Sequence, residues 1–234
     1  MALGTTLSQV ENISTTAGLY GINSISAGTA AIQEAVDSSG TLTLCLMGYH
    51  HDYSNNAPTQ NGDHTQIRVY YMEQGGGYRP HIGVVQGLSV TEVYAESTGT
   101  DDDSYQQHFT LDGSVSWSTI RGDSTTTGNA YQANVGSSWS GVYTIKFTGR
   151  GSDVITSVVR SYFVFDLSVI TGTVDAAKFN FYLDNVGHTN DDFGKVVVVQ
   201  ATALAGDTSD FGNCFVEDTG TTTTHNATLF GTNF

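Results

Sequence analysis

Hydrophobic and polar residues alternate along most of this chain with a period of two, which is the spacing of β-strands that bury one face. Gly, Asn, Asp and Ser clusters separate seven segments of this kind, all rich in Val, Ile, Tyr and Phe: 42–48, 66–72, 81–86, 142–148, 158–167, 178–183 and 195–203. Only segment 27–36 repeats Ala, Ile and Val at helical spacing. The pattern predicts an all-β protein, an antiparallel β-sandwich or jelly roll with at most one short helix.

Two of the predicted strands are apolar on both faces. Large apolar side chains occupy odd and even positions of 158–167, and 195–203 contains four successive valines. Such strands lie at the centre of a structure and are covered on both sides. We therefore expect eight side chains of these and the neighbouring strands to be buried: Leu44, Leu46, Phe163, Phe165, Phe179, Phe181, Val197 and Val199.

The composition excludes several classes of function. The chain has 23 acidic and 8 basic residues, a net charge of −15, and only 13% charged positions. This acidity argues against nucleic acid and against anionic membrane surfaces as partners, because both are bound through clustered Lys and Arg. The aromatic content of 11% argues against disorder. The first residues lack the basic and apolar regions of a secretory signal, and no apolar run approaches a membrane span.

Catalytic and metal-binding motifs are missing from the sequence. A nucleophile elbow, an HExxH motif, a Walker loop and a zinc Cys/His array are all absent, so we expect no enzyme activity, no catalytic residue and no resident cofactor. His50 and His51 adjoin Asp52 at a predicted strand end, where neighbouring side chains point to opposite faces and share a metal poorly. Two acidic groups are candidates for Ca²⁺ ligands, with solvated loops as the simpler interpretation: Asp101, Asp102 and Asp103, and Asp184, Asp191 and Asp192.

The two cysteines leave two interpretations open. Cys45 lies inside an apolar strand, which favours a buried free thiol, and a disulfide between Cys45 and Cys214 in an oxidising setting is the alternative.

Several other polar and aromatic residues have a simple structural interpretation. The tripeptide at 121–123 (Arg-Gly-Asp) is interpreted as a turn after a strand at Trp117, not as an integrin ligand. Arg160 and Asp166 share one strand face about 20 Å apart, so each should find a partner on a neighbouring strand. Trp117 and Trp139 with the many tyrosines can form a sugar platform, although aromatic side chains of a sandwich mostly lie in its core.

Segment 158–168 (VVRSYFVFDLS) resembles the R-S-Y-L-x-F-D-x-S strand of the DNRLRE-type (disaggregatase-related) β-sandwich domains. It resembles more closely a degenerate form of that strand found in bacteriophage virion proteins. Segment 169–179 is similar to the family's turn into the next strand, segments 112–114 and 117–121 to its opening, and 209–211 to a short stretch after the valine-rich strand.

The order of these segments departs from the family's pattern. Four segments, 18–23, 28–32, 42–52 and 71–84, resemble the family's closing half, yet here they come first. Residues 1–88 and 90–234 are then each an incomplete sandwich with exposed strand edges. We expect one domain, 1–234, in which the halves complete each other within the chain, with exchange between neighbouring chains as the alternative.

The resemblance implies a non-enzymatic virion structural protein: first a phage capsid decoration (cement) protein, then a head or tail appendage. Such a protein would form homo-oligomers, bind the major capsid protein or other virion proteins, and lie on the outer surface of the virion, extracellular after lysis. Two other classes stay open. A carbohydrate-binding or receptor-binding adhesin, with surface glycans as ligands, would be favoured by a solvent-facing aromatic row on one sheet. A self-assembling extracellular filament subunit would use half-domain exchange.

Overall fold

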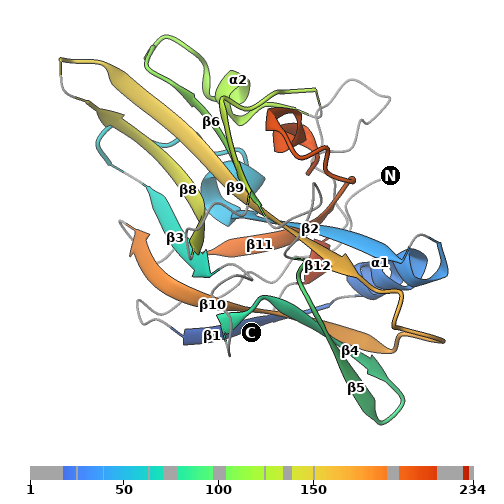
Figure 1. The fold of residues 1–234 in the computed structure, drawn as a ribbon. Coiled ribbons are helices and arrows are strands. Elements are labelled where there is room, and N and C mark those ends of the chain that lie inside the picture. The colour runs from blue at the N-terminus through green and yellow to red at the C-terminus, as the bar shows by residue number, and fades with distance from the viewer. Residues whose placement is uncertain are drawn as a thin grey trace.

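The computed structural model describes residues 18–24, 26–38, 40–62, 64–70, 78–96, 104–123, 125–133, 139–149, 151–188, 195–214 and 229–231. Its strands are β1 (Gly18–Asn23), β2 (Thr41–Gly48), β3 (Thr65–Tyr70), β4 (His81–Gln86), β5 (Ser89–Tyr94), β6 (Ser104–Thr110), β7 (Ala130–Ala133), β8 (Trp139–Thr148), β9 (Val154–Asp166), β10 (Ala176–His188), β11 (Val196–Ala201) and β12 (Leu229–Gly231). Every pairing between these strands is antiparallel, so the predicted all-β antiparallel class is confirmed (Figure 1).

Helices are few and short. The predicted helix is α1 (Ser26–Asp37), and its buried Ile32 and Ala35 join the main core. The sequence predicted at most one helix, whereas the described chain also contains a π-helix, η1 (Tyr49–Tyr53), a helix α2 (Trp117–Arg121) and a 3-10 helix, η5 (Thr208–Gly212). These three are about one turn each, too short to produce the periodicity that reveals a helix. None of the helices in the described ranges is long and apolar enough to cross a membrane.

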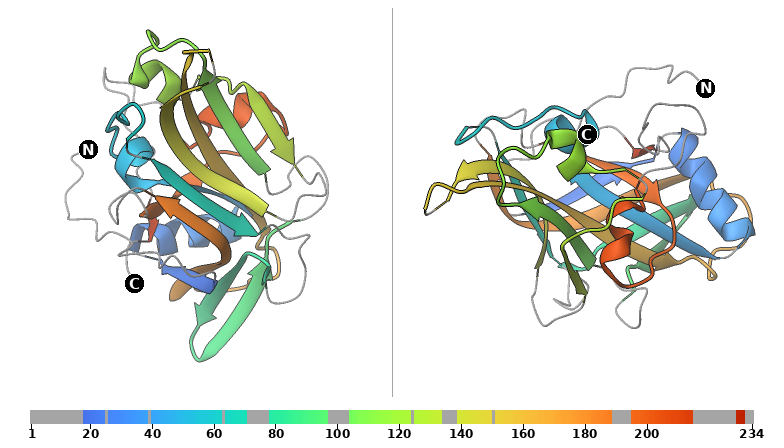
Figure 2. Two further views of the ribbon diagram at one scale, coloured as in Figure 1. Left: turned by 90° about the vertical axis from the view of Figure 1, so that its left-hand side faces the viewer. Right: turned by 90° about the horizontal axis from the view of Figure 1, so that it is seen from above.

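Two long strands organise the sheet. β9 pairs with β6 along one edge, and along its other edge it pairs first with β8 and then with β2. Ser161 and Tyr162 show the two edges, because each of them pairs with β6 on one side and with β2 on the other. β10 pairs with β1 along one edge and with β4 and then β3 along the other. β11 and β12 extend the sheet beyond β2, and the pairing of β3 with β8 joins the β9 and β10 parts. Figure 2 shows the sheet folding back on itself.

The main core lies between the β9–β2 and the β10–β3–β4 parts of the sheet. Its centre is a group of phenylalanines on β9 and β10, where the ring of Phe179 lies 5.4 Å from that of Phe163 and 5.9 Å from that of Phe165. All eight side chains predicted to be buried are at most 3% exposed, which confirms the prediction. Alternation of apolar side chains, read from the sequence, thus located the core correctly.

A second apolar layer covers the opposite face of β2, β9 and β11. Cys45 and Met47 of β2 pack there with Tyr162 and Val164 of β9 and with alternate valines of β11. η1 and segment 202–214 close over this layer, and Phe211 of η5 packs on Val158 and Ile120. β9 and β11 are therefore covered on both faces, as their sequences predicted.

Strands from the first part of the chain pair with strands from the second part. β2 pairs with β9 and β11, β3 with β8 and β10, and β4 with β10. The main core accordingly contains side chains from both segments, such as Leu44 and Phe163. In this structure residues before and after position 89 share one sheet and one core within a single chain.

Candidate functional site

The first polar site is buried beneath η1. The sequence predicted that 50–52 continue a strand end with alternating side chains, and this was wrong, because these residues form the π-helix η1. The turn brings the rings of His50 and His51 together edge to face at 4.8 Å, and Nδ1 of His51 lies 2.8 Å from the carbonyl oxygen of Asn56. Asp52 points inward from the same turn and is fully buried. The helical turn therefore delivers a carboxylate to the interior.

Arg160 of β9 is the partner of Asp52. Its guanidinium binds the carboxylate through two bonds, Nε to Oδ2 and Nη2 to Oδ1, both 2.7 Å long. Nη1 donates to the carbonyl oxygen of Phe211 at 2.8 Å, and Nη2 donates to that of Arg121 at 2.7 Å. Burial is the largest effect on the pKa of Arg160 and lowers it, but the charge and hydrogen bonds of Asp52, together with Cys214 and Tyr162, outweigh burial and raise the pKa. The expected partner on a neighbouring strand lies instead in the turn that follows strand β2.

Arg121 is the third member of what we call the buried ion network: Asp52, Arg121 and Arg160. It ends α2, which the sequence predicted as a strand, and the side chain of Ser116 caps the helix by accepting from the Thr119 amide. Its Nε lies 3.6 Å from Oδ1 of Asp52 and donates to the Asp52 carbonyl oxygen. Burial lowers the pKa of Arg121 to about 10, against the opposing effect of Asp52.

The tripeptide at 121–123 ends in a turn, as predicted. Gly122 has a φ of 76°, in the left-handed region, and a Cβ there would meet Thr126 at 2.6 Å, so only glycine fits. Oδ1 of Asp123 accepts from the amide and hydroxyl of Thr125. Arg121 is only 3% exposed, so the tripeptide is not displayed as a ligand.

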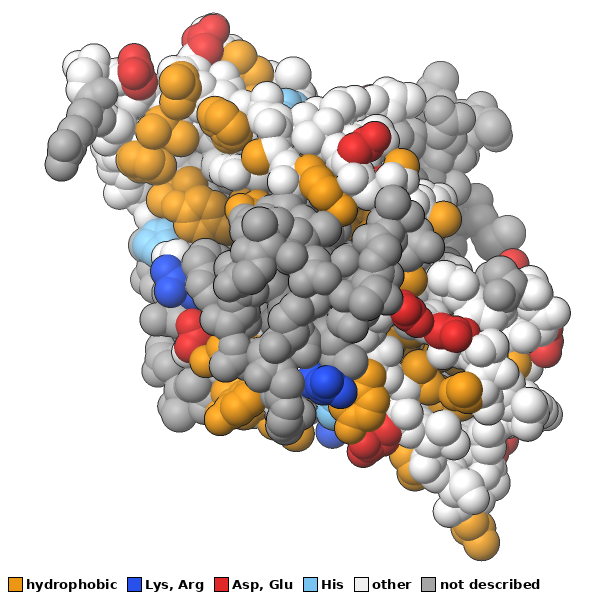
Figure 3. All heavy atoms as spheres, in the orientation of Figure 1, with side chains coloured by type: hydrophobic (Ala, Val, Ile, Leu, Met, Phe, Trp, Pro, Cys, Tyr) orange, Lys and Arg blue, Asp and Glu red, His pale blue; other side chains and the backbone are white. Residues whose placement is uncertain are grey.

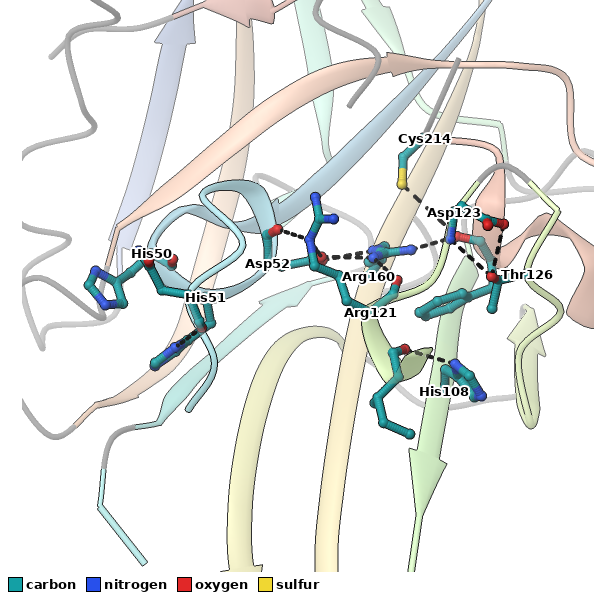
Figure 4. A network of polar contacts seen from close by, with 12 residues as sticks. His50, His51, Asp52, His108, Arg121, Asp123, Thr126, Arg160 and Cys214 are labelled. Atoms are coloured by element: carbon teal, nitrogen blue, oxygen red, sulfur yellow. Dashed lines mark hydrogen bonds and ion pairs between the residues drawn. The ribbon is translucent and has the colours of Figure 1, made fainter. Parts of the chain in front are cut away.

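Segment 202–214 packs on the buried ion network through Phe211 (Figure 4). The ring of Phe211 lies over the guanidinium of Arg160, 4.1 Å from centroid to Cζ, and its carbonyl oxygen also accepts from the hydroxyl of Tyr162. His108 of β6 contacts the Phe211 ring edge-on at 5.4 Å, and Nδ1 lies 2.8 Å from the carbonyl oxygen of Ile120. Burial lowers the pKa of His108. The network joins β9, η1, α2 and η5 where solvent does not reach, which suits a structural role.

Five of the six candidate Ca²⁺ ligands lie outside the described part of the chain. Asp101, Asp102, Asp103, Asp191 and Asp192 lie outside the described residues, and Asp184 accepts a hydrogen bond from the Tyr70 hydroxyl at 2.8 Å. Within the described ranges, no three His, Cys, Asp or Glu side chains converge as metal ligands.

The structure tests two further sequence interpretations, those of Asp166 and Trp117, and corrects the first. Asp166 was expected to bond a neighbouring strand, but it is exposed and accepts from the Ser168 amide in the following turn. Trp117 packs against the buried Ile120 and Phe211, as the interpretation of aromatic side chains as core residues predicted, while the side chain of Trp139 lies outside the described residues.

A second candidate site, missed by sequence reasoning, is formed by tyrosines on the outer side of the β3–β10–β4–β5 part of the sheet. Tyr78 lies 5.2 Å from Tyr70 and 4.6 Å from Tyr182 between ring centroids, and Tyr70 lies 5.6 Å from Tyr182. Tyr94 follows on β5, with its ring 5.3 Å from that of His81. Tyr78 is 41% and Tyr94 39% exposed. We call Tyr70, Tyr78, Tyr94 and Tyr182 the tyrosine face.

Polar groups surround the tyrosine face. The carboxylate of Asp184 accepts from Tyr70, that of Glu92 accepts from the Tyr94 hydroxyl at 2.9 Å, and Cζ of Arg79 lies 5.8 Å from the Tyr94 ring. His81 of β4 pairs with Asn180 of β10, which places both between Tyr94 on β5 and Tyr182 on β10. The surface thus offers aromatic carbon beside hydrogen-bond donors and acceptors.

A hollow of about 210 Å³ opens next to the tyrosine face. Gly141 and Tyr143 of β8, Gln66 and Arg68 of β3, and Tyr105 and Gln107 of β6 are among the residues that line it. Arg68 and Tyr70 both alternate with the buried Ile67 and Val69, so the hollow and the tyrosine face lie on the same side of β3. The left view of Figure 2 shows these strands side by side.

A sequence signal for the tyrosine face was present in the same alternation that located the core. Once Phe179 and Phe181 are placed inside, Tyr182 must point outward with Asp184. Tyr70 likewise points outward, because its neighbour on the same strand, Val69, points inward. What the sequence does not show is that β3, β4, β5 and β10 bring these positions to one surface.

Comparisons of this chain with family models, with curated proteins and with solved structures found no match.

Proposed function

We propose that this chain is a non-enzymatic recognition protein that binds carbohydrate through the tyrosine face. The observation that carries the proposal is the group of four partly exposed tyrosines from three strands and the segment before β4, with carboxylates and other polar side chains around them. Tyrosine supplies a large apolar ring and a polar hydroxyl at a low cost in conformational entropy. The C–H faces of a sugar pack on such rings, while its hydroxyls need donors and acceptors beside them.

The ring orientations favour a particular kind of glycan. Tyr78 and Tyr182 meet at an interplanar angle of 86°, so together they form a corner and not a flat platform. A corner holds one sugar ring from two sides, whereas a flat crystalline polysaccharide needs coplanar rings. Asp184 lies beside Tyr70 at one end of this corner, where its carboxylate can accept from sugar hydroxyls. The proposed ligand is a short or terminal oligosaccharide.

The test is a glycan array with the purified chain, followed by titration of any ligand found. Tyr78→Ala and Tyr182→Ala should each weaken binding by roughly tenfold, the value of one lost aromatic contact. Tyr49→Ala makes the same chemical change in η1, within the other apolar layer, and should leave affinity unchanged. Thermal melting of each variant separates lost contacts from lost folding. Absence of glycan binding, or an equal loss in the Tyr49→Ala control, would contradict the proposal.

We further propose that the chain is displayed on the outer surface of a virion, as a capsid decoration protein or a head or tail appendage. The sequence resemblance of 158–168 and its flanking segments to phage virion domains supports this placement. An apolar patch supports it independently. Ile145 and Phe147 of β8 lie beside Ile155 of β9 and Phe109 of β6 on one side of the sheet, and each is partly exposed. Hydrophobic side chains also gather over the β8–β9 end in Figure 3.

This apolar patch suits attachment to a major capsid protein, another virion protein or a second copy of the chain. Phe147→Ser should reduce co-sedimentation of the purified chain with virus particles that lack it, whereas Tyr182→Ala should not. Light scattering of the free protein measures homo-oligomers, and imaging of the native assembly distinguishes decoration from filament formation. Unchanged co-sedimentation of Phe147→Ser would contradict attachment through the patch.

A further inference from the structure

The two cysteines of the chain meet beneath segment 202–214. Cys45 of β2 lies directly opposite Tyr162 of β9, and both side chains are fully buried in the second apolar layer. Cys214 belongs to the same layer, and its Sγ lies 4.0 Å from the carbonyl oxygen of Phe211, which also accepts from the Tyr162 hydroxyl. The Cys214 thiol is close enough to Cys45 and to the Tyr162 hydroxyl for each of them to affect its pKa. Cys45, Tyr162 and Cys214 therefore belong to one buried group.

The surroundings make the two thiols unequal. Burial raises the pKa of Cys45 well above its ordinary value, and the adjacent Cys214 raises it further. Burial also acts to raise the pKa of Cys214, but the neighbouring Cys45 thiol and the charge of Arg160 act against burial and lower it. Cys214 Sγ and the Arg160 guanidinium both contact the carbonyl oxygen of Phe211, so a Cys214 thiolate would form beside a fixed positive charge. Because the thiolate is the reactive form, Cys214 is the nucleophile of the pair.

We propose that Cys45 and Cys214 are an intramolecular disulfide site that closes when the chain meets a peroxide, and that the bond ties segment 202–214 to β2. The Cys214 thiolate attacks one oxygen of hydrogen peroxide; an S–O bond forms, the O–O bond breaks, and hydroxide leaves and is protonated to water. Cys45, once deprotonated, attacks the resulting sulfenic acid; the S–S bond forms, the S–O bond breaks, and the second hydroxide leaves as water. Two thiols are oxidised and one peroxide is reduced to two waters.

The disulfide bond would fix the position of segment 202–214, which covers the buried ion network. Segment 202–214 carries Phe211, which receives hydrogen bonds from Arg160 and Tyr162 and stacks on the guanidinium. Because both thiols are buried, the oxidant reaches them when this segment opens locally, and the bond then prevents that opening. It also closes a loop of more than 100 residues, for which chain-entropy stabilisation is largest. The site does not depend on any glycan or virion partner.

The test oxidises the reduced, folded chain with hydrogen peroxide and measures its intact mass and free thiols. The expected product is a monomer that has lost two hydrogen atoms and whose denatured form no longer reacts with maleimide. Its melting temperature should rise by roughly 10 °C and return after reduction. Because the chain has only two cysteines, the product is unambiguous.

Two variants check the order of the steps. Cys45→Ala should stop at a sulfenic acid that dimedone traps, and Cys214→Ala should consume little peroxide. If either variant fails to fold, the wild-type mass measurement still decides. Disulfide-linked dimers, two labelled thiols after oxidation, or accumulation of sulfinic acid in the wild-type chain would each overturn the proposal.

Discussion

Removing the carboxylate of Asp52 should destabilise the fold by about 3–5 kcal/mol, the cost of leaving a buried charge without its partner. In Asp52→Ala the guanidinium of Arg160 loses two hydrogen bonds of 2.7 Å while it remains fully buried. Hydrogen bonds to charged groups contribute roughly 1.5–3 kcal/mol each, which agrees with that range. The bonds from Arg160 to the carbonyl oxygens of Phe211 and Arg121 remain, so the loss should not reach the full desolvation cost of the ion.

The assay is equilibrium unfolding in urea, with Asp52→Leu, Arg160→Met and the double variant completing a thermodynamic cycle. Because the double variant removes both charges and keeps apolar volume, its free energy of unfolding should be higher than that of either single variant. Asp166→Ala is the matched control, since this exposed carboxylate accepts from Ser168 in the adjoining turn, and it should cost less than about 1 kcal/mol.

Two results would refute this reasoning. If Asp52→Ala costs as little as the Asp166→Ala control, the buried ion network does not hold η1 to β9. If the two single substitutions add within about 0.5 kcal/mol in the double variant, Asp52 and Arg160 act independently.

Three other predictions follow from the core, from His108 and from the shared sheet. Phe163→Ala should cost roughly 3–5 kcal/mol in the same urea assay, and a loss below about 1 kcal/mol would make β9 peripheral. Because burial lowers the pKa of His108 in the fold, stability should be fully present above its unfolded value near 6.5 and fall as the pH falls below it; His108→Gln should flatten this fall, and an unchanged profile would contradict it. Residues 1–88 and 90–234, expressed separately, should be insoluble or unfolded and regain structure on mixing, as circular dichroism can follow; a cooperative melt of 1–88 alone would contradict a single domain.

The order of the residues determined the class of the fold and most of its interior. Alternation of side chains across a strand is a local property of the backbone, so β4 was placed at 81–86 and the burial of Phe163 and Phe179 was predicted without tertiary information. Apolar residues on both faces identified β9 and β11 as doubly covered strands for the same reason. The periodic segment 27–36 was long enough to show its helical spacing.

Short elements and polar pairs were decided by the tertiary structure alone. Residues 49–53 and 117–121 are single helical turns that bury Asp52 and Arg121 against β9, and a single turn is stabilised by this packing more than by its own sequence. Neither the bond from Asp52 to Arg160 nor the meeting of Cys45 with Cys214 has a local signal, because each joins segments far apart in the chain.

The tyrosine face shows where the two kinds of information meet. The sequence determines that Tyr182 points away from Phe181, since successive side chains of a strand face opposite ways. Only the pairing of β10 with β3 and β4 brings Tyr182 beside Tyr70 and Tyr78. That pairing depends on how the whole sheet buries its apolar side, a long-range balance of contacts that no window of the sequence contains.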